Sequence, residues 1–159
     1  MKYYIPLFIV LILAGCQKQH RANPEFRLIK GTVTFNGAPV EGAIVAFVPT
    51  DSTGHSAGGK TDGAGFYTLT ADNALVPGSG TKPGKYKVTV KKTEAPVDPD
   101  QQDFESGKIT ADELMQRMAE RKPLRPKNLL PDKYADANTT PLEVTVEDKK
   151  ENVIDLPIE

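Results

Sequence analysis

The feature of this sequence that most constrains its fold is a repeated alternation of apolar and polar side chains with a period of two residues. In the clearest run, Tyr86, Val88 and Val90 alternate with lysine and threonine. Because successive side chains of a strand point to opposite faces, this run predicts a strand with one buried face and one wet face. The same alternation recurs in three other runs, at 29–35, 142–146 and 152–158. The chain is therefore expected to fold mainly from half-buried strands.

Turn-forming residues separate these runs. Asn36-Gly37 predicts a tight turn because both residues tolerate positive φ, and the segment 62–65 (DGAG) has a similar composition. The apolar run 43–48 is typical of a strand that is covered on both faces, and Pro49 ends it. The total of 13 glycines and 13 prolines fits frequent turns. The pattern predicts an all-β domain of about seven strands, arranged as a β-sandwich.

The segment 93–128 interrupts the alternation and is predicted to be an insertion in the sandwich. Thr110 and Glu113 have the spacing of a capping box, which marks the start of a helix. Apolar residues follow at helical spacing, so we expect a short amphipathic helix over 111–121.

The apolar face of this helix consists of Leu114, Met115 and Met118. These residues are candidates for binding a partner, because methionine side chains repack readily against varied surfaces. More often such a stripe covers an open end of a sandwich, and this second arrangement is the one that we expect.

Residues 1–15 have the layout of a secretory signal peptide. Lys2 supplies a positive charge, an apolar run extends to Leu13, and the small residues Ala14 and Gly15 follow. The apolar region of a signal peptide has about 7–15 residues, whereas a membrane-spanning helix needs about 20. The segment is therefore predicted to direct export and to be removed.

The sequence Leu13-Ala14-Gly15-Cys16 resembles a lipobox, the site at which bacterial lipoproteins are processed. The resemblance implies that Cys16 becomes an acylated N-terminus carrying several chains, since one chain alone binds a membrane weakly. Residues 16–26 are then a lipidated tether. Gln17 stands where an Asp retains some lipoproteins at the inner membrane, which favours the outer membrane. The predicted localisation is the cell envelope.

The charge of the chain argues against nucleic-acid binding, and its cysteine content excludes an internal disulfide. The formal net charge is −1, so a concentrated basic face for nucleic acid is not expected. Cys16 is the only cysteine, and an internal disulfide is therefore excluded. The stability of the domain must come from its core.

The sequence contains no recognisable pattern of catalytic or metal-ligating residues. Its two histidines are His20, in the predicted tether, and His55, in a polar loop. Neither has the spacing of a zinc site or of a hydrolase triad. We therefore predict no catalytic residues, no metal and no cofactor. The loops 51–59 and 71–83 remain as candidate ligand-binding segments.

Several segments together resemble the carboxypeptidase-regulatory-like domain, a transthyretin-like β-sandwich. They follow in the order 29–43 (IKGTVTFNGAPVEGA), 60–69 (KTDGAGFYTL), 83–90 (PGKYKVTV) and a closing strand. The segments 130–134 (LPDKY) and 139–142 (TTPL) further resemble lipoproteins of planctomycete-type bacteria. The resemblance implies a Greek-key sandwich over 27–159, with 93–128 outside the shared pattern.

The predicted function is that of a non-enzymatic, membrane-anchored lipoprotein, a structural or protein-interaction module of the bacterial cell envelope. The alternative is a ligand-binding module for a glycan or another envelope polymer, using the loops 51–59 and 71–83. Against this alternative, the loops offer few aromatic side chains for stacking on sugars. The partner is an envelope protein or polymer that the sequence does not identify. An internal Lys–Asn isopeptide bond is a further option for such a sandwich.

Overall fold

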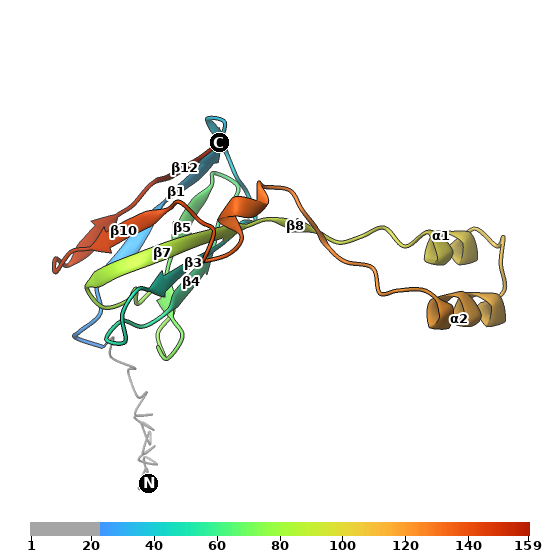
Figure 1. Ribbon diagram of the computed structural model, residues 1–159, viewed down its shortest axis with the longest axis horizontal. Helices are drawn as coiled ribbons and strands as arrows, with labels where there is room; N and C mark the ends of the chain where they lie inside the picture. Colours follow the sequence, from blue (N-terminus) through green and yellow to red (C-terminus); the bar gives the residue numbers. More distant parts are fainter. Residues whose placement is uncertain (1–22) are drawn as a thin grey trace, which may run out of the picture.

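The computed structural model describes residues 23–159, so the predicted signal peptide, Cys16 and His20 lie outside the described residues. The described chain is an all-β sandwich with one two-helix insertion that projects from it (Figure 1). Its longer strands are β1 (Leu28–Phe35), β3 (Ile44–Pro49), β4 (Ala57–Lys60), β7 (Gly84–Lys91) and β10 (Glu143–Val146). Its shorter strands are β2 (Ala38–Pro39), β5 (Phe66–Thr68), β6 (Thr70–Ala71), β8 (Thr93–Glu94), β9 (Lys127–Asn128), β11 (Glu151–Val153) and β12 (Leu156–Ile158). The helices are α1 (Pro99–Glu105), α2 (Ala111–Glu120) and a short 3-10 helix, η1 (Asp132–Tyr134).

One sheet is built around β1. On one side β1 pairs in parallel with β11 and then with β12, which places Ile29 opposite Asn152 and Val33 opposite Leu156. On its other side it pairs antiparallel with β5 and β2. The second sheet has the strand order β10-β7-β3-β4-β6, and all of its pairs are antiparallel. The chain between β5 and β6 changes sheets at the buried Leu69.

The core lies between the two sheets. Phe47 of β3 and Tyr67 of β5 belong to opposite sheets, and their ring centroids are 6.5 Å apart. The ring centroid of Tyr86, in β7, lies 5.9 Å from that of Phe47. The alternation predicted for β7 is confirmed, because Val88 and Val90 are fully buried while its lysines reach solvent. Burying such a side chain stabilises the folded state by roughly 1.5–3 kcal/mol.

Two details of the strands differ from the sequence-based expectation. The run 43–48 is not covered on both faces, because Ile44 is 55% exposed on the outer face of its sheet. The predicted strand 152–158 is divided into β11 and β12. This division, together with the two-residue strands β2, β6, β8 and β9, gives the described chain twelve strands where about seven were expected.

The break between β11 and β12 brings the carbonyl of Ile154 against Gly31. A β-carbon at Gly31 would lie 1.8 Å from this oxygen, so only glycine fits. The hydroxyl of Tyr67 donates to the same oxygen at 2.7 Å, and the carboxylate of Asp155 accepts from the N–H and the hydroxyl of Thr32, both at 2.8 Å. Burial, with a contribution from the charge of Asp155, raises the pKa of Tyr67.

The sandwich has two ends that carry different segments (Figure 1). The N-terminal end holds Asn23 and the loops 50–56 and 72–83, because residues of these segments line common pockets. The insertion leaves from the opposite end, which we call the arm end. The eight residues of β7 run from the loop 72–83 to the insertion, a rise of about 26 Å at about 3.3 Å per residue.

Candidate functional site

The insertion forms an arm, residues 93–128, that stands away from the sandwich. At its base β8 pairs antiparallel with β9 through two residue pairs. At its far end α1 and α2 pack on each other (Figure 1). The chain therefore leaves the sandwich and returns to it at one place, and the helices make their main contacts with each other.

The first helix of the arm was not expected, because the only helix predicted for the insertion was that over 111–121. Asp98 is its N-cap, and the carboxylate accepts hydrogen bonds from the N–H groups of Asp100 and Gln101 at 3.0 and 3.3 Å. Pro99 occupies the first turn, where the helix needs no N–H donor. The pair Asp98-Pro99 was therefore the sequence signal for this helix.

The second helix confirms the predicted capping box. The Thr110 hydroxyl accepts from the N–H of Glu113 at 3.3 Å, and the Glu113 carboxylate accepts from the N–H of Thr110 at 2.8 Å. These hydrogen bonds from Thr110 lower the pKa of Glu113. The helix ends at Glu120, one residue before the predicted end.

Ion pairs join α1 to α2. Arg121, the C-cap of α2, donates to both carboxylate oxygens of Asp98 and to Asp100 at 3.0 Å. Arg117 lies 3.3 Å from Asp100 and 3.9 Å from Asp103. The hydrogen bonds from Arg121 lower the pKa of Asp98 to about 2. These ion pairs could not be predicted from the sequence, because they join residues of two helices of which only one was predicted.

The predicted apolar face is divided by this packing. Leu114 is buried where α2 packs on α1, apart from the core of the sandwich. Met115 and Met118 are 72% and 50% exposed, and Phe104 of α1 is 39% exposed. The expectation that this face covers an open end of the sandwich is therefore wrong. The helix is held away from the core by the arm, and its two methionines face solvent.

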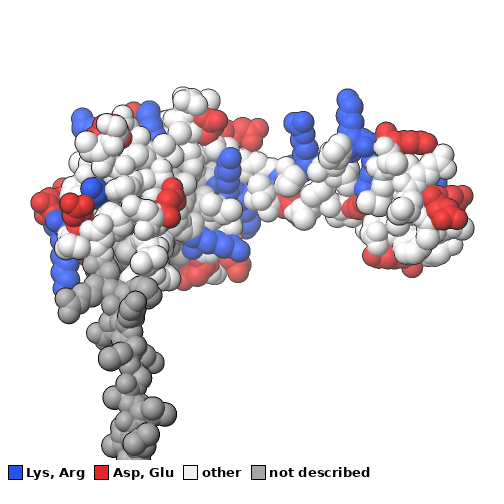
Figure 2. All heavy atoms as spheres, turned by 90° about the horizontal axis from the view of Figure 1, so that it is seen from below, with Lys and Arg blue, Asp and Glu red and all other residues white. Residues whose placement is uncertain are grey.

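Acidic side chains outnumber exposed basic ones at the far end of the arm, where Lys108 and Arg117 are also exposed. Figure 2 shows acidic side chains over the far end and basic side chains projecting from the stalk, the extended segments 93–97 and 122–128. The exposed acidic residues of the helices are Glu105, Asp112, Glu113 and Glu120, and the basic residues of the stalk are Lys122, Arg125 and Lys127. A partner at the far end would therefore meet exposed methionines and several exposed acidic side chains.

The two candidate ligand-binding loops lie together at the N-terminal end. The N–H of Asp72 donates to the carbonyl of Ser56 at 3.0 Å, and the Thr81 hydroxyl donates to the carbonyl of His55 at 2.6 Å. The ring of His55 stands edge-on to Phe26, with centroids 5.7 Å apart, and Phe26 is only 7% exposed. The Phe26 ring is thus not available to stack on a sugar.

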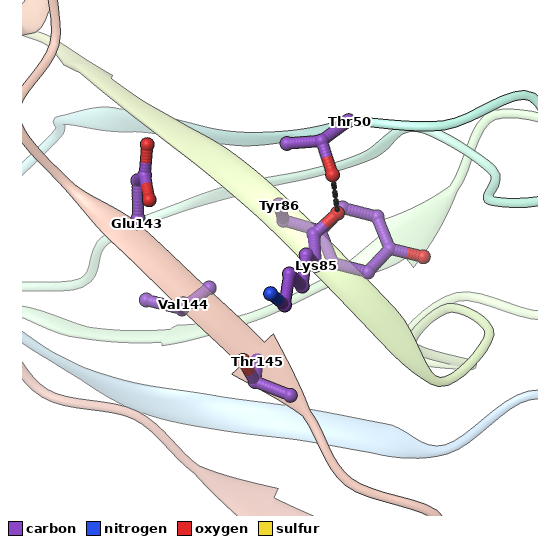
Figure 3. A pocket seen from close by; sticks show the side chains of 6 residues that line it. All are labelled: Thr50, Lys85, Tyr86, Glu143, Val144 and Thr145. Atoms are coloured by element: carbon purple, nitrogen blue, oxygen red, sulfur yellow. Dashed lines mark hydrogen bonds between the residues drawn. The ribbon is translucent and has the colours of Figure 1, made fainter.

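A shallow hollow of about 260 Å³ lies over β7 and β10. Figure 3 shows its lining, with Lys85, Glu143 and Thr145 around the opening and the Thr50 hydroxyl donating to the carbonyl of Lys85 at 3.1 Å. Glu143 is engaged by Lys87 at 2.5 Å, and this ion pair lowers the pKa of Glu143. The carboxylate is thus ionised and paired, which suits cross-strand stabilisation better than proton transfer.

Residues 23–159 contain no group of three or more His, Cys, Asp or Glu side chains placed to hold a metal ion. Asn152 is buried, but its amide exchanges hydrogen bonds of 3.0 and 3.1 Å with the backbone of Glu147. The buried residues of this part of the chain include no lysine that could form an isopeptide bond with it.

The chain matches no known family model, no curated protein and no solved structure. Among the described residues, the helices are too short and too polar to cross a membrane.

Proposed function

We propose that this chain is a non-enzymatic, membrane-anchored lipoprotein that presents its arm to a protein partner in the bacterial cell envelope. One observation carries the proposal: α2 projects from the end of the sandwich opposite to Asn23 and exposes Met115 and Met118. An anchor at Cys16 would therefore leave these methionines directed away from the attachment point.

The anchor rests on the sequence Leu13-Ala14-Gly15-Cys16 after an apolar run that is too short to span a membrane. Several acyl chains at one cysteine would give lasting attachment. The lipidated form would sit in the outer membrane, because Gln17 follows the cysteine.

The role of the arm rests on its exposed surface. Exposed methionines on a helix are adaptable contacts, and the sandwich does not need them for its core. An arm of this kind has no evident structural task within the domain, which favours a task outside it. Phe104 of α1 is a further partly exposed apolar side chain on the arm.

We also propose that the domain is a carboxypeptidase-regulatory-like domain with transthyretin-like Greek-key topology. Support comes from the order of its elements: a tight turn after β1, a second turn at 62–65 before β5, and a long inner strand, β7, introduced by Pro83-Gly84. The closing strands return to β1. This arrangement says little about the ligand, since one fold serves many functions.

The anchor is tested by Cys16→Ser. The variant is expected to lose its lipid and to leave the detergent phase in detergent partitioning, while wild-type protein stays in it. Mass spectrometry of the wild-type N-terminus should find acyl chains on Cys16. Equal partitioning of variant and wild type would refute the lipoprotein proposal.

The arm is tested by photo-crosslinking in intact cells. A crosslinking amino acid at Met115 or Met118 should capture a specific envelope protein, whereas the same group at Ile44 should not. Ile44 is a matched control because it is 55% exposed, as Met118 is 50% exposed, but lies on the sheet. Capture of the same protein from all three positions, or from none, would refute a role of the arm in recognition.

The alternative, binding of a glycan or another envelope polymer, is favoured by the contact between the loops at 51–59 and 71–83. It is weakened by the burial of Phe26. A glycan array probed with the unlipidated domain distinguishes the two proposals, because only the alternative predicts binding that a change at Asn73 or His55 abolishes.

A further inference from the structure

The loop 72–80 carries a large apolar side chain at its tip, close to where the described chain begins. Leu75 is 77% exposed. It borders a pocket of about 160 Å³ that is also lined by Asn23 and Phe26. This exposed leucine therefore lies at the N-terminal end of the sandwich, next to the segment that leads to Cys16.

The loop is ordered from both sides, so Leu75 is held outward. The N–H of Ala74 donates to the carbonyl of Ala71 at 2.9 Å, and Ala74 packs against the core. On the other side, the N–H of Gly78 donates to the Thr70 hydroxyl at 2.8 Å. A loop fixed in this way needs little further ordering when its tip meets another surface.

The chain between Cys16 and Asn23 is short. At about 3.3–3.6 Å per residue it extends at most about 25 Å. An acylated Cys16 lies at the membrane surface, so the N-terminal end of the sandwich is confined near the bilayer. This confinement raises the effective concentration of the loop at the membrane, and a contact too weak to bind alone can then form.

Two basic side chains at this end are already paired with carboxylates. Arg27 is paired with Asp148 at 2.5 Å, and Lys82 with Glu25 at 2.9 Å. Basic side chains that are already neutralised by neighbouring carboxylates offer little attraction to anionic lipid headgroups. Leu75 is the exposed group at this end that a lipid surface would accept.

We infer that Leu75 inserts into the interfacial layer of the membrane that holds Cys16, so that the N-terminal end of the sandwich rests on the bilayer. The inference rests on the proposed lipid anchor, which supplies the confinement. It adds an orientation: the loop 72–80 contacts lipid, and the arm at the opposite end points away from the membrane.

The chain has no tryptophan, so a single introduced tryptophan reports its own surroundings. Full-length lipidated Leu75→Trp is reconstituted into phosphatidylcholine vesicles, with and without bromine on the acyl chains. Val97→Trp is the matched control, because Val97 is 69% exposed but lies in the stalk of the arm. Thermal melting checks that both variants fold as wild type does.

The tryptophan of Leu75→Trp is expected to emit at shorter wavelength on vesicles than in detergent-free buffer. Brominated lipid should quench about half of its emission or more, because interfacial apolar groups lie about 5–10 Å deep. Emission in Val97→Trp should not change.

If both variants float with vesicles but emission in Leu75→Trp is neither shifted nor quenched, the inferred lipid contact is wrong while the anchor stands. Equal quenching in both variants would also overturn it. If neither variant floats, the anchor fails, and the contact fails with it.

Discussion

Arg121 donates through its two terminal nitrogens to the two carboxylate oxygens of Asp98, and so joins the end of α2 to the start of α1. The same carboxylate caps α1 through the N–H groups of Asp100 and Gln101. The Asp98 side chain thus caps the N-terminus of α1 and also joins α1 to α2 through Arg121. A two-pronged contact of this kind is more specific than a single ion pair.

The first prediction concerns pH. Hydrogen bonds from Arg121 lower the pKa of Asp98 from 3.8 to about 2 in the folded arm. A group whose pKa is lower in the folded state stabilises that state above its unfolded pKa, and the contribution is lost as pH falls through the folded value. Amide hydrogen exchange in α1 and α2 should therefore accelerate relative to the sandwich strands as the pH falls from about 4 to about 2.

The control for this prediction is a substitution at neutral pH. Arg121→Gln should accelerate exchange in both helices, whereas Lys108→Gln, which removes only a more exposed contact with Asp103, should have little effect. Equal protection of the helices in wild type and Arg121→Gln would mean that the pair does not hold the arm closed.

The second prediction concerns the independence of the arm. Replacing 95–126 by a short Gly/Ser linker keeps β8 and β9 and removes both helices. Since Leu114 is buried within the arm and not in the core, the melting temperature should fall by no more than about 4 °C, equivalent to roughly 1 kcal/mol. A much larger fall, measured by circular dichroism, would show that the arm supports the sandwich.

The third prediction concerns Gly31. In Gly31→Ala the new methyl group would overlap the carbonyl of Ile154, and relieving the overlap must displace β11 or β12. The free energy of unfolding should fall by about 3 kcal/mol or more in denaturant titration. Gly63→Ala is the control, because a β-carbon there has only one neighbour, the Glu41 carboxylate at 4.0 Å. Similar stability of the two variants would contradict the close approach.

The fourth prediction concerns the two faces of β7. Val88 is fully buried, so Val88→Asp buries an unpaired charge and should destabilise the domain by roughly 3 kcal/mol or more. Lys91→Asp places the same side chain on the exposed face and should change stability by less than about 0.5 kcal/mol. Lys87 is unsuitable as a control because it pairs with Glu143. Comparable unfolding midpoints would show that the alternation does not mark the core.

The strands could be predicted because their signals are local. Alternation in β7 follows directly from which face is buried, and Asn36-Gly37 forms the expected turn with φ of 50° and 82°. The capping box at Thr110 is a contact over three residues. Each of these features depends only on near neighbours in the chain.

The placement of the elements could not be predicted because it depends on distant contacts. The amphipathic pattern of α2 is the same whether its apolar face meets a core or another helix, and only the presence of α1 decides between them. Likewise, the break at Ile154 follows from its contact with Gly31, more than a hundred residues earlier in the chain. For the candidate site, the sequence identified Met115 and Met118 but not the surface that leaves them exposed.

The parallel pairing of β1 with β11 and β12 also sets an order of events during folding. β1 is the first strand of the domain along the chain, while its partners on one side are the last two. Contacts between such distant segments form slowly and late. The arm, whose contacts are local, can close without waiting for the residues that follow 121. The part of the protein that we propose for recognition would thus take shape before the scaffold that carries it.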